Sequence, residues 1–395
     1  MNIIVCNIGS SSFKFQLLDM PAERQRARGY TERVGTQDAI TTYWVGDRQV
    51  HQSVRPVPSH REAVQSALDF LVDSANGILT SLDQIDGVGF KTVQAGEKNG
   101  SVFLTDDVLE AMEAYRELAP AHNPPYLTAI RMFRSLLPRT PLVGVFEPGF
   151  HTTIPEYARL YGTPYEWYAT FGVRKYGYHG ASHKFIATET VRLLGLPAAN
   201  HRIISCHLGG SSSVCAIKNG ASLDTSMGFT PQSGLLQGTR VGDMDPFVLP
   251  FVMKKKGITL DQALAECSKN GGLAGISGIS ADMREINAAV ARGDRRAGLA
   301  RDRFIYDCKR YVGEYLVLLE GADAIVFTGG IGQRDAALRR EVLGALTFLG
   351  LKLDDAKNDA HAQIITAKDS TVAGVVIATD EEIVVARETM RVIST

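Results

Sequence analysis

Residues 207–213 read His-Leu-Gly-Gly-Ser-Ser-Ser and join two apolar runs of the kind that forms strands. About half a chain earlier, residues 7–12 read Asn-Ile-Gly-Ser-Ser-Ser and join two more such runs. Two strand–turn–strand units at this separation predict two similarly folded halves, each beginning with such a unit. On these two motifs alone, an equally good interpretation is that glycine and serine simply recur in turns.

The chain on either side of these turns alternates between strand-like and helix-like patterns. The Asn219-Gly220 pair is a strong hairpin signal after the second motif. Hydrophobic periodicity predicts strands at residues 2–7, 13–18, 85–94, 141–146, 202–207, 214–218, 322–328 and 372–378, and helices at residues 61–77, 106–118, 124–137, 183–194, 245–256, 259–268, 303–320 and 381–392. The sequence therefore predicts a mixed α/β protein.

Composition narrows the possible classes of protein. The 395 residues allow two to three domains, two being the simplest division, and 45% hydrophobic with 22% charged residues is globular composition. A formal net charge of -1 removes the electrostatic argument for nucleic acid or an anionic membrane as a partner. The residue pattern leads us to expect neither a membrane span nor a signal peptide, and the five cysteines include no C-x-x-C pair. We therefore expect a cytoplasmic protein with free, mostly buried thiols.

Glycine-rich turns that follow predicted strands are candidate phosphate sites. Such turns lie at residues 9–12, 209–213 and 329–332, and a further glycine-rich stretch lies at residues 271–278. Glycine lets the backbone approach a ligand closely, while serine hydroxyls and successive N–H groups supply donors. Each turn alone is weak evidence, but open sheets bind ligands at strand ends. The chain lacks both the G-x-x-x-x-G-K-[ST] phosphate loop and the dinucleotide fingerprint.

Several charged side chains could carry chemistry at these strand ends. His179 lies between glycines and can donate to developing negative charge, although a structural loop histidine is the commoner case. Arg240, also flanked by glycines, can present a rigid donor fork to a phosphoryl group or a carboxylate, the alternative being a surface salt bridge. Glu147 and Glu381 follow buried strands, where a carboxylate either faces a ligand or is simply solvated.

Taken in order, these motifs resemble the acetate kinase family, a member of the acetate and sugar kinase, Hsp70 and actin superfamily. The resemblance runs nearly end to end and is most specific at residues 7–14, 118–124, 176–183 and 224–231. It implies an α/β fold with two duplicated ribonuclease-H-like (actin-like ATPase) domains and a cleft between them. The expected N-terminal domain is residues 1–150, joined by the C-terminal helix 382–395, and the expected nucleotide-binding domain is residues 151–381. A homodimer is also implied.

The resemblance implies ATP- and Mg²⁺-dependent, reversible phosphoryl transfer to a short carboxylic acid, acetate by default, giving an acyl phosphate and ADP. It places Asn7 and Glu381 at the metal. It places Glu147, His179, Arg240 and His122 in catalysis, and Lys91, Val93, Ala121, Tyr178 and Pro231 at the acid. The residues expected at the nucleotide are Ser10, Ser12, Lys14, His207, Leu208, Gly209, Gly210, Ser211, Asp282, Met283, Arg284, Gly330, Ile331, Gly332, Gln333 and Arg334.

This chain departs from the family pattern mainly around the acid. Lys91 replaces an arginine, Glu147 an aspartate, Ala121 a leucine and Tyr178 a phenylalanine, while Gly210 replaces an asparagine of the nucleotide loop. Lysine keeps the charge but loses the bidentate fork, and the longer glutamate displaces its carboxylate. The departures leave three alternatives open: a larger or more polar acid, a different phosphoryl donor such as pyrophosphate, or a non-catalytic nucleotide-binding protein on the same fold.

Overall fold

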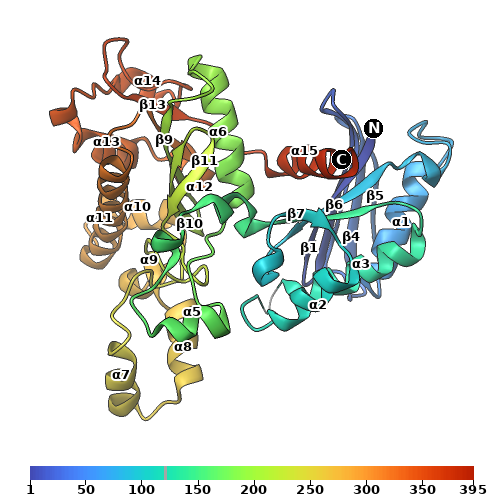
Figure 1. Ribbon diagram of the computed structural model, residues 1–395, viewed down its shortest axis with the longest axis horizontal. Coiled ribbons are helices and arrows are strands. Elements are labelled where there is room, and N and C mark those ends of the chain that lie inside the picture. Colours follow the sequence, from blue (N-terminus) through green and yellow to red (C-terminus); the bar gives the residue numbers. More distant parts are fainter. Residues whose placement is uncertain (120–121) are drawn as a thin grey trace. The chain divides into compact units, whose positions relative to one another are not determined.

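The computed structural model describes residues 1–119 and 122–395 and divides the chain into two compact units (Figure 1). The first unit is Met1–Gly149 with Asp380–Thr395, and the second unit is Phe150–Thr379. Ala121, one of the residues expected at the acid, lies outside the described residues.

The first unit is built on an eight-stranded sheet with the order β5-β4-β3-β2-β1-β6-β8-β7. The strands β1 and β2 form an antiparallel hairpin, and β6 and β8 then run parallel to β1. The bounds of the strands are β1 (Asn2–Gly9), β2 (Ser12–Asp19), β3 (Arg24–Glu32), β4 (Ala39–Val45), β5 (Arg48–Arg55), β6 (Gly87–Thr92), β7 (Ser101–Phe103) and β8 (Leu142–Phe146).

Helices cover the sheet of the first unit on both faces. α1 (His60–Val72) and α3 (Asn123–Leu136) bury apolar side chains against residues such as Phe13 and Phe90, and α2 (Asp106–Ala114) packs on α3. On the other face, α15 (Glu381–Ile393) lies against β1, β6 and β8 (Figure 1). This approach needs Gly89, because a Cβ there would lie 2.2 Å from Thr389 Oγ1. The glycine in β6 therefore lets α15 pack closely on the sheet.

The second unit contains a five-stranded sheet with the order β11-β10-β9-β12-β13. Asn219 and Gly220 both have positive φ, as the predicted hairpin turn between β10 and β11 requires. The bounds of the strands are β9 (Arg202–Leu208), β10 (Ser212–Lys218), β11 (Ala221–Thr225), β12 (Ala324–Thr328) and β13 (Ala373–Val376).

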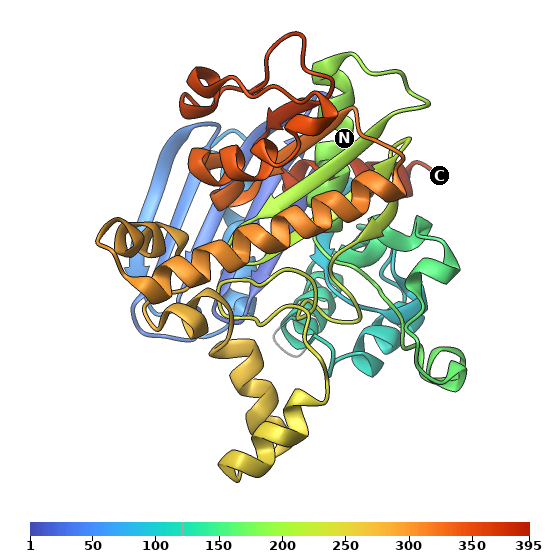
Figure 2. The ribbon, with the colours of Figure 1, turned by 90° about the vertical axis from the view of Figure 1, so that its left-hand side faces the viewer.

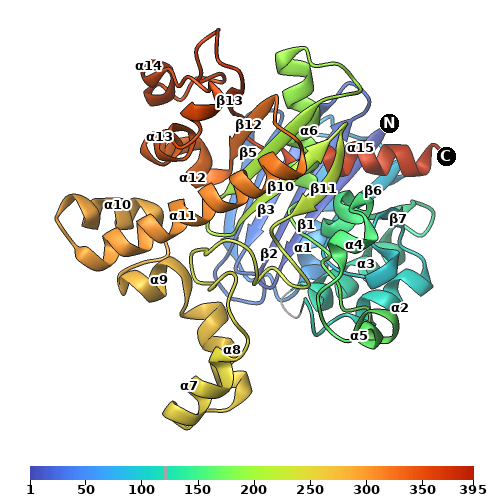
Figure 3. The ribbon, with the colours of Figure 1, turned by 60° about the vertical axis from the view of Figure 1, so that its left-hand side comes forward.

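Two helices sandwich this second sheet. α6 (Gly180–Leu194) packs Ile186 and Ala187 on one face, while α11 (Arg295–Leu318) packs Phe304 and Cys308 on the other. Figure 2 shows α11 running across the strands, and Figure 3 shows α6 and α11 on either side of them. The remaining helices are α4 (Glu156–Arg159), α5 (Tyr165–Phe171), α7 (Val248–Lys256), α8 (Leu260–Lys269), α9 (Gly272–Ser277), α10 (Met283–Ala291), α12 (Gly329–Arg334), α13 (Ala336–Gly344) and α14 (Asp355–Asp359).

The two sheets share one topology. In the first, β3-β2-β1 are antiparallel neighbours, and β6 and β8 continue parallel to β1. In the second, β11-β10-β9 are antiparallel neighbours, and β12 and β13 continue parallel to β9. Each Gly/Ser motif occupies the first hairpin turn of its sheet. The prediction of two similarly folded, ribonuclease-H-like halves is thus confirmed.

Some helix starts differ from those predicted. α6 begins at Gly180, so Ser182 lies within its first turn, 2.8 Å from His207 Nδ1, and does not cap it. α7 begins at Val248, three residues after the predicted start, so Asp245 lies outside the helix and accepts from the Phe247 N–H.

Two further expectations were tested by the fold. All five cysteines are free, and four of them are buried. In the part of the chain that the structure describes, no helix is both long and apolar enough to cross a bilayer.

Candidate active site

In the first unit, a lysine is held between two carboxylates. Lys91 lies near the end of β6, Glu147 follows the neighbouring strand β8, and Glu381 opens α15. Lys91 Nζ lies 2.9 Å from Glu147 Oε1 and also contacts Glu381 Oε2. The three side chains are 25%, 9% and 16% exposed. The fold therefore brings together three residues that span 290 positions of the sequence. The residue predicted to bind the acid, Lys91, contacts both Glu147 and Glu381.

The electrostatics of this cluster favour a charged lysine. Burial by itself lowers the pKa of Lys91, but the negative charges of Glu147 and Glu381 outweigh burial and raise it. The lysine then compensates two carboxylates that would otherwise repel each other in a poorly solvated place.

Asn7 and Lys14 lie beside each other on the β1–β2 hairpin. The Tyr126 hydroxyl, on α3, accepts from the Ile8 N–H at 3.3 Å and donates to Asn7 Oδ1 at 3.4 Å. Burial raises the pKa of Tyr126, so its hydroxyl keeps the proton that it donates. Tyr126 thus orients the amide of Asn7, a role for which the sequence carried no separate signal.

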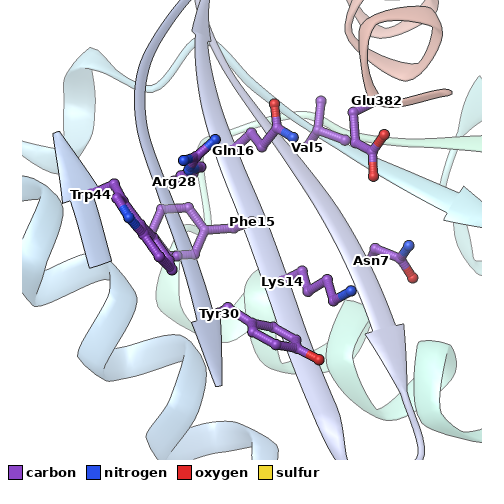
Figure 4. Close-up of a pocket in the computed structure, with 10 residues that line it drawn as sticks. Val5, Asn7, Lys14, Phe15, Gln16, Arg28, Tyr30, Trp44 and Glu382 are labelled. Carbon is purple, nitrogen blue, oxygen red and sulfur yellow. The ribbon is translucent and has the colours of Figure 1, made fainter. Parts of the chain in front are cut away.

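Asn7 and Lys14 also line a hollow of about 340 Å³ in the first unit (Figure 4). Lys14 Nζ lies 4.5 Å from the centre of the Tyr30 ring. Farther along the hollow, the Arg28 guanidinium lies 5.0 Å from the centre of the Trp44 ring. These side chains come from alternate positions of neighbouring strands, so they share one face of the sheet. Ser10 and Ser12 lie at the adjoining hairpin turn, His122 is the N-cap of α3, and Val93 follows β6.

In the second unit, three distant stretches line one hollow of about 530 Å³. They are the β9–β10 turn, the first half of α10 with the residues before it, and α12 with its C-cap. Gly329 allows the last of these to approach the first, because its φ is +74° and a Cβ would lie 2.5 Å from the Leu208 carbonyl oxygen. The predicted nucleotide residues that line the hollow are Gly209, Gly210, Asp282, Met283, Arg284, Gly330, Ile331 and Arg334.

Ala281, Asn287 and Asp335 line the same hollow, although the sequence did not single them out. Asn287 Nδ2 donates to Asp335 Oδ2 at 2.8 Å, and this bond joins two walls of the hollow. Of the nucleotide residues predicted in the second unit, five are not among its lining residues, namely His207, Leu208, Ser211, Gly332 and Gln333. Gly332 is buried, and Gln333 lines a different hollow beside α6. Asn287 could have been found from its position one turn after Met283 on an amphipathic helix.

Arg240 is held by neutral acceptors. Its Nη1 donates to Ser211 Oγ at 3.0 Å and to Gln237 Oε1 at 3.1 Å, and lies 3.5 Å from the Pro231 carbonyl oxygen. Burial lowers the pKa of Arg240. These contacts orient the guanidinium without neutralising its charge, so it stays able to attract an anion.

His179 is the N-cap of α6, and its Nδ1 lies 2.7 Å from Ser213 Oγ on β10. Its ring stacks on that of His207, with centres 4.2 Å apart. Ser213 is two residues beyond Ser211, the partner of Arg240. One serine-rich turn therefore holds both the predicted arginine and the predicted histidine, and the glycines of the same turn line the 530 Å³ hollow.

Tyr178, expected at the acid, is buried, and its hydroxyl donates to the Phe229 carbonyl oxygen at 2.8 Å. The hydroxyl that distinguishes this residue from phenylalanine therefore donates its single proton to a backbone carbonyl oxygen. It does not supply a new donor to a ligand.

Comparison with known proteins places the chain among carboxylate kinases. The sequence model of the acetokinase family matches residues 2–387. The acetate kinase of Shouchella clausii (strain KSM-K16) is 45% identical over 395 residues, covering 99% of both chains. The acetate kinase of Geobacillus sp. (strain WCH70) is 44% identical over 392 residues, covering 98% of both.

Solved structures agree over the whole chain. The crystal structure of Porphyromonas gingivalis acetate kinase has a TM-score of 0.91 at 38% identity and covers 99% of each chain. A propionate kinase from Francisella tularensis subsp. tularensis SCHU S4 has a TM-score of 0.88 at 35% identity, again covering 99% of each. With the family match spanning nearly all residues, this chain belongs to the acetokinase family.

Proposed function

We propose that this protein transfers the γ-phosphoryl group of ATP to the carboxylate of acetate, reversibly, giving acetyl phosphate and ADP. The observation that carries the proposal is the serine-rich turn of the second unit. Its glycines line a hollow of a size that suits a nucleotide, and its serines hold Arg240 and His179. Family membership supports a phosphotransferase with a carboxyl group as acceptor.

In the forward reaction, a carboxylate oxygen of acetate forms a bond to the γ-phosphorus. The bond from that phosphorus to the β,γ-bridging oxygen breaks, and its electron pair leaves with ADP. Such transfers need positioning and charge stabilisation more than covalent help. Arg240 and His179 would donate to the oxygens of the transferring group, where negative charge is largest.

Asn7 and Glu381 suit Mg²⁺ by the chemistry of their donors. Both offer oxygen ligands, and Mg²⁺ commonly takes one or two protein ligands and completes its shell with water and substrate phosphates. Among residues 1–119 and 122–395, no group of three or more His, Cys, Asp or Glu side chains could hold a metal. When bound, Mg²⁺ would neutralise phosphate charge. Tyr126 would keep the Asn7 oxygen directed, and Lys91 would balance Glu381 and Glu147.

Acetate is favoured over a more polar acid because the Tyr178 hydroxyl is already engaged by the backbone. ATP is favoured over pyrophosphate because three stretches of the second unit enclose more space than a pyrophosphate requires. Within the first unit, Lys14, Ser10, Ser12 and His122 would assist the transfer.

Trapping the product with hydroxylamine tests the reaction and its substrates together. Purified protein is incubated with acetate, propionate, butyrate or a hydroxy acid, and with either ATP or pyrophosphate. We expect acyl hydroxamate with ATP, with acetate giving the highest kcat/KM. Product with pyrophosphate alone, a higher kcat/KM for a hydroxy acid, or ATP binding without product would each contradict the proposal.

Filling the 530 Å³ hollow should weaken ATP binding. Gly330 lines it, and a Cβ there would meet no atom within 4 Å, so the Gly330→Leu side chain would enter the hollow without disturbing the fold. We expect the Kd for ATP, measured by calorimetry, to rise at least about tenfold. The control is Gly298→Leu in α11, where a Cβ also meets open space. An unchanged Kd, or an equal rise in the control, would refute the assignment.

We also propose that the two compact units are the two domains of the family, and that the protein is a cytoplasmic homodimer. Exposed apolar side chains support a subunit contact, since Phe247 is 80% and Phe251 64% exposed near α7. Light scattering should then give about twice the chain mass of 42.9 kDa. A mass equal to one chain would exclude the dimer.

A further inference from the structure

A chain of buried hydroxyl and imidazole groups stands behind His179. Ser213 Oγ lies 2.7 Å from His179 Nδ1 and 2.9 Å from His183 Nε2. On the far side of that second ring, His183 Nδ1 lies 2.9 Å from Ser205 Oγ. We propose that Ser213 and His183 are positioning residues, which hold His179 in the tautomer that carries its proton on Nε2. The inference rests on the proposed phosphoryl transfer and names how one of its donors is prepared.

The backbone of His179 shows that its side chain is directed by its surroundings. Its φ of 57° and ψ of 26° lie in the left-handed region, which non-glycine residues seldom adopt. Such conformations persist where neighbouring contacts over-determine them, and they cluster at functional sites. Here the contacts are the Ser213 hydroxyl at Nδ1 and the His207 ring, inclined by 24° to that of His179. Nδ1 is thereby engaged by Ser213, and we assign Nε2 to contact with the substrate.

A neutral His183 gives this row of hydrogen bonds a single direction. It lies one turn along α6 from His179 and is 0% exposed. Burial, with the nearby His151 and His207, lowers the pKa of His183 well below its ordinary value, so its ring is neutral. A neutral imidazole donates from one nitrogen and accepts at the other. The two serines at its two nitrogens satisfy both roles, and His183 cannot take up a second proton to change them.

The single proton of the Ser213 hydroxyl links the two rings. If His183 Nε2–H donates to Ser213 Oγ, the Ser213 proton is directed to His179 Nδ1, and Ser205 donates to His183 Nδ1. A neutral His179 then carries its own proton on Nε2 and can donate to a phosphoryl oxygen. If the hydrogen bonds ran the other way, from His179 Nδ1–H to Ser213, Nε2 of His179 would present a lone pair to that phosphoryl oxygen and repel it. We therefore assign the first direction to the active protein.

Loss of this hydroxyl should reduce turnover more than binding. The Ser213→Ala variant leaves His179 in place but frees its ring to turn and to exchange tautomers. Partners that fix the tautomer of a catalytic histidine or of a metal ligand are worth about 10- to 10⁴-fold elsewhere. We expect kcat to fall on the order of 10²-fold, with KM for ATP and acetate changed less than about threefold. Ser213→Thr, which restores a hydroxyl, should recover most of the loss.

The matched control is Ser226→Ala. Ser226 is also a buried serine of the second unit, and its hydroxyl accepts from the Val214 N–H at 2.9 Å. Among the described residues, no hydrogen bond joins Ser226 to the His179 ring. This variant should lose stability without the selective fall in kcat. A fall in kcat of the same size in both variants, or one within about twofold of wild type in Ser213→Ala, would overturn the proposal.

A spectroscopic readout keeps the inference separate from the proposed reaction. In protein with ¹⁵N-labelled histidine, the His179 signals are assigned by their loss in His179→Gln. We expect wild-type His179 to show a protonated Nε2 and an unprotonated Nδ1, and Ser213→Ala to shift toward a mixture. A protonated Nδ1 with unprotonated Nε2 in wild type would refute the positioning role, even if acetyl phosphate is made. Conversely, if His179 shows the expected tautomer but no acetyl phosphate forms, the positioning role is supported and the proposed reaction is refuted.

Discussion

Replacing Arg240 by alanine should lower kcat for acetyl phosphate formation about 10³-fold while the protein stays folded. The size of the effect follows from the charge that a guanidinium supplies to a transferring phosphoryl group, which is worth 10³–10⁵-fold in other phosphotransferases. In this structure the guanidinium is held by Ser211 and Gln237 and is not paired with a carboxylate in the part of the chain that is described. Initial-rate kinetics with saturating ATP and acetate measure the change.

A matched variant separates this effect from a general loss of charge. Arg192→Ala removes an arginine from the same unit, one that is 73% exposed and pairs with Glu189. It should leave kcat unchanged. Arg240→Lys should recover little activity, because an ammonium lacks the planar fork that two phosphoryl oxygens can share. Full activity in Arg240→Ala would remove Arg240 from the catalytic group.

Replacing Lys91 by methionine should lower the free energy of unfolding of the first unit by about 3 kcal/mol. Removing one partner of a largely buried ionic cluster leaves the others uncompensated, and such losses are about 3–5 kcal/mol. Here two carboxylates, Glu147 and Glu381, would face each other without the cation between them. We expect the lower end of this range because the Lys91 side chain is 25% exposed.

The measurement can report on the first unit alone. The chain has two tryptophans, Trp44 in the first unit and Trp167 in the second, so a Trp167→Phe background leaves Trp44 as the fluorescent probe during urea unfolding. The control is Lys98→Met, which breaks an exposed pair with Asp107 and should cost less than about 1 kcal/mol. Equal losses in the free energy of unfolding for Lys91→Met and Lys98→Met would show that the cluster stabilises the first unit no more than an exposed ion pair does.

Raised pH should weaken this cluster only at the alkaline extreme. The pKa of Lys91 is higher in the folded protein than its ordinary value, so its contribution to stability is complete below the ordinary pKa. That contribution is lost only as pH rises through the raised folded value. The cluster therefore stays intact across the neutral range in which the enzyme would work.

The duplicated fold could be predicted because its signal is local and appears twice. Each Gly/Ser motif marks a tight turn between two strands, and the Asn219-Gly220 pair fixes the next hairpin. The start of α11 was placed eight residues late, at residue 303 instead of Arg295. The true start depends on Asp294, whose side chain accepts from the Ala297 N–H ahead of the apolar pattern. Polar capping residues of this kind are common in loops, so their sequence signal is weak.

The candidate site was predictable in its charged groups and not in the groups that hold them. Arg240 and His179 stand out among glycines, but Gln237 and Ser205 belong to ordinary loop and strand sequence. Their roles arise from tertiary packing, which brings Gln237 within hydrogen-bond distance of Ser211 and Ser205 within hydrogen-bond distance of His183. Spacing along the chain carries no record of those contacts.

Oxygen-labelled acetate gives the most direct test of the central claim, that the acid's own carboxylate attacks the phosphorus of ATP. The protein is incubated with ATP and acetate labelled with ¹⁸O in both carboxyl oxygens, and the products are followed by ³¹P NMR. The account predicts acetyl phosphate with one ¹⁸O bound to phosphorus, seen as an isotope-shifted resonance, together with one ADP for each acetyl phosphate. Release of ADP with unlabelled phosphate and no acetyl phosphate would contradict it.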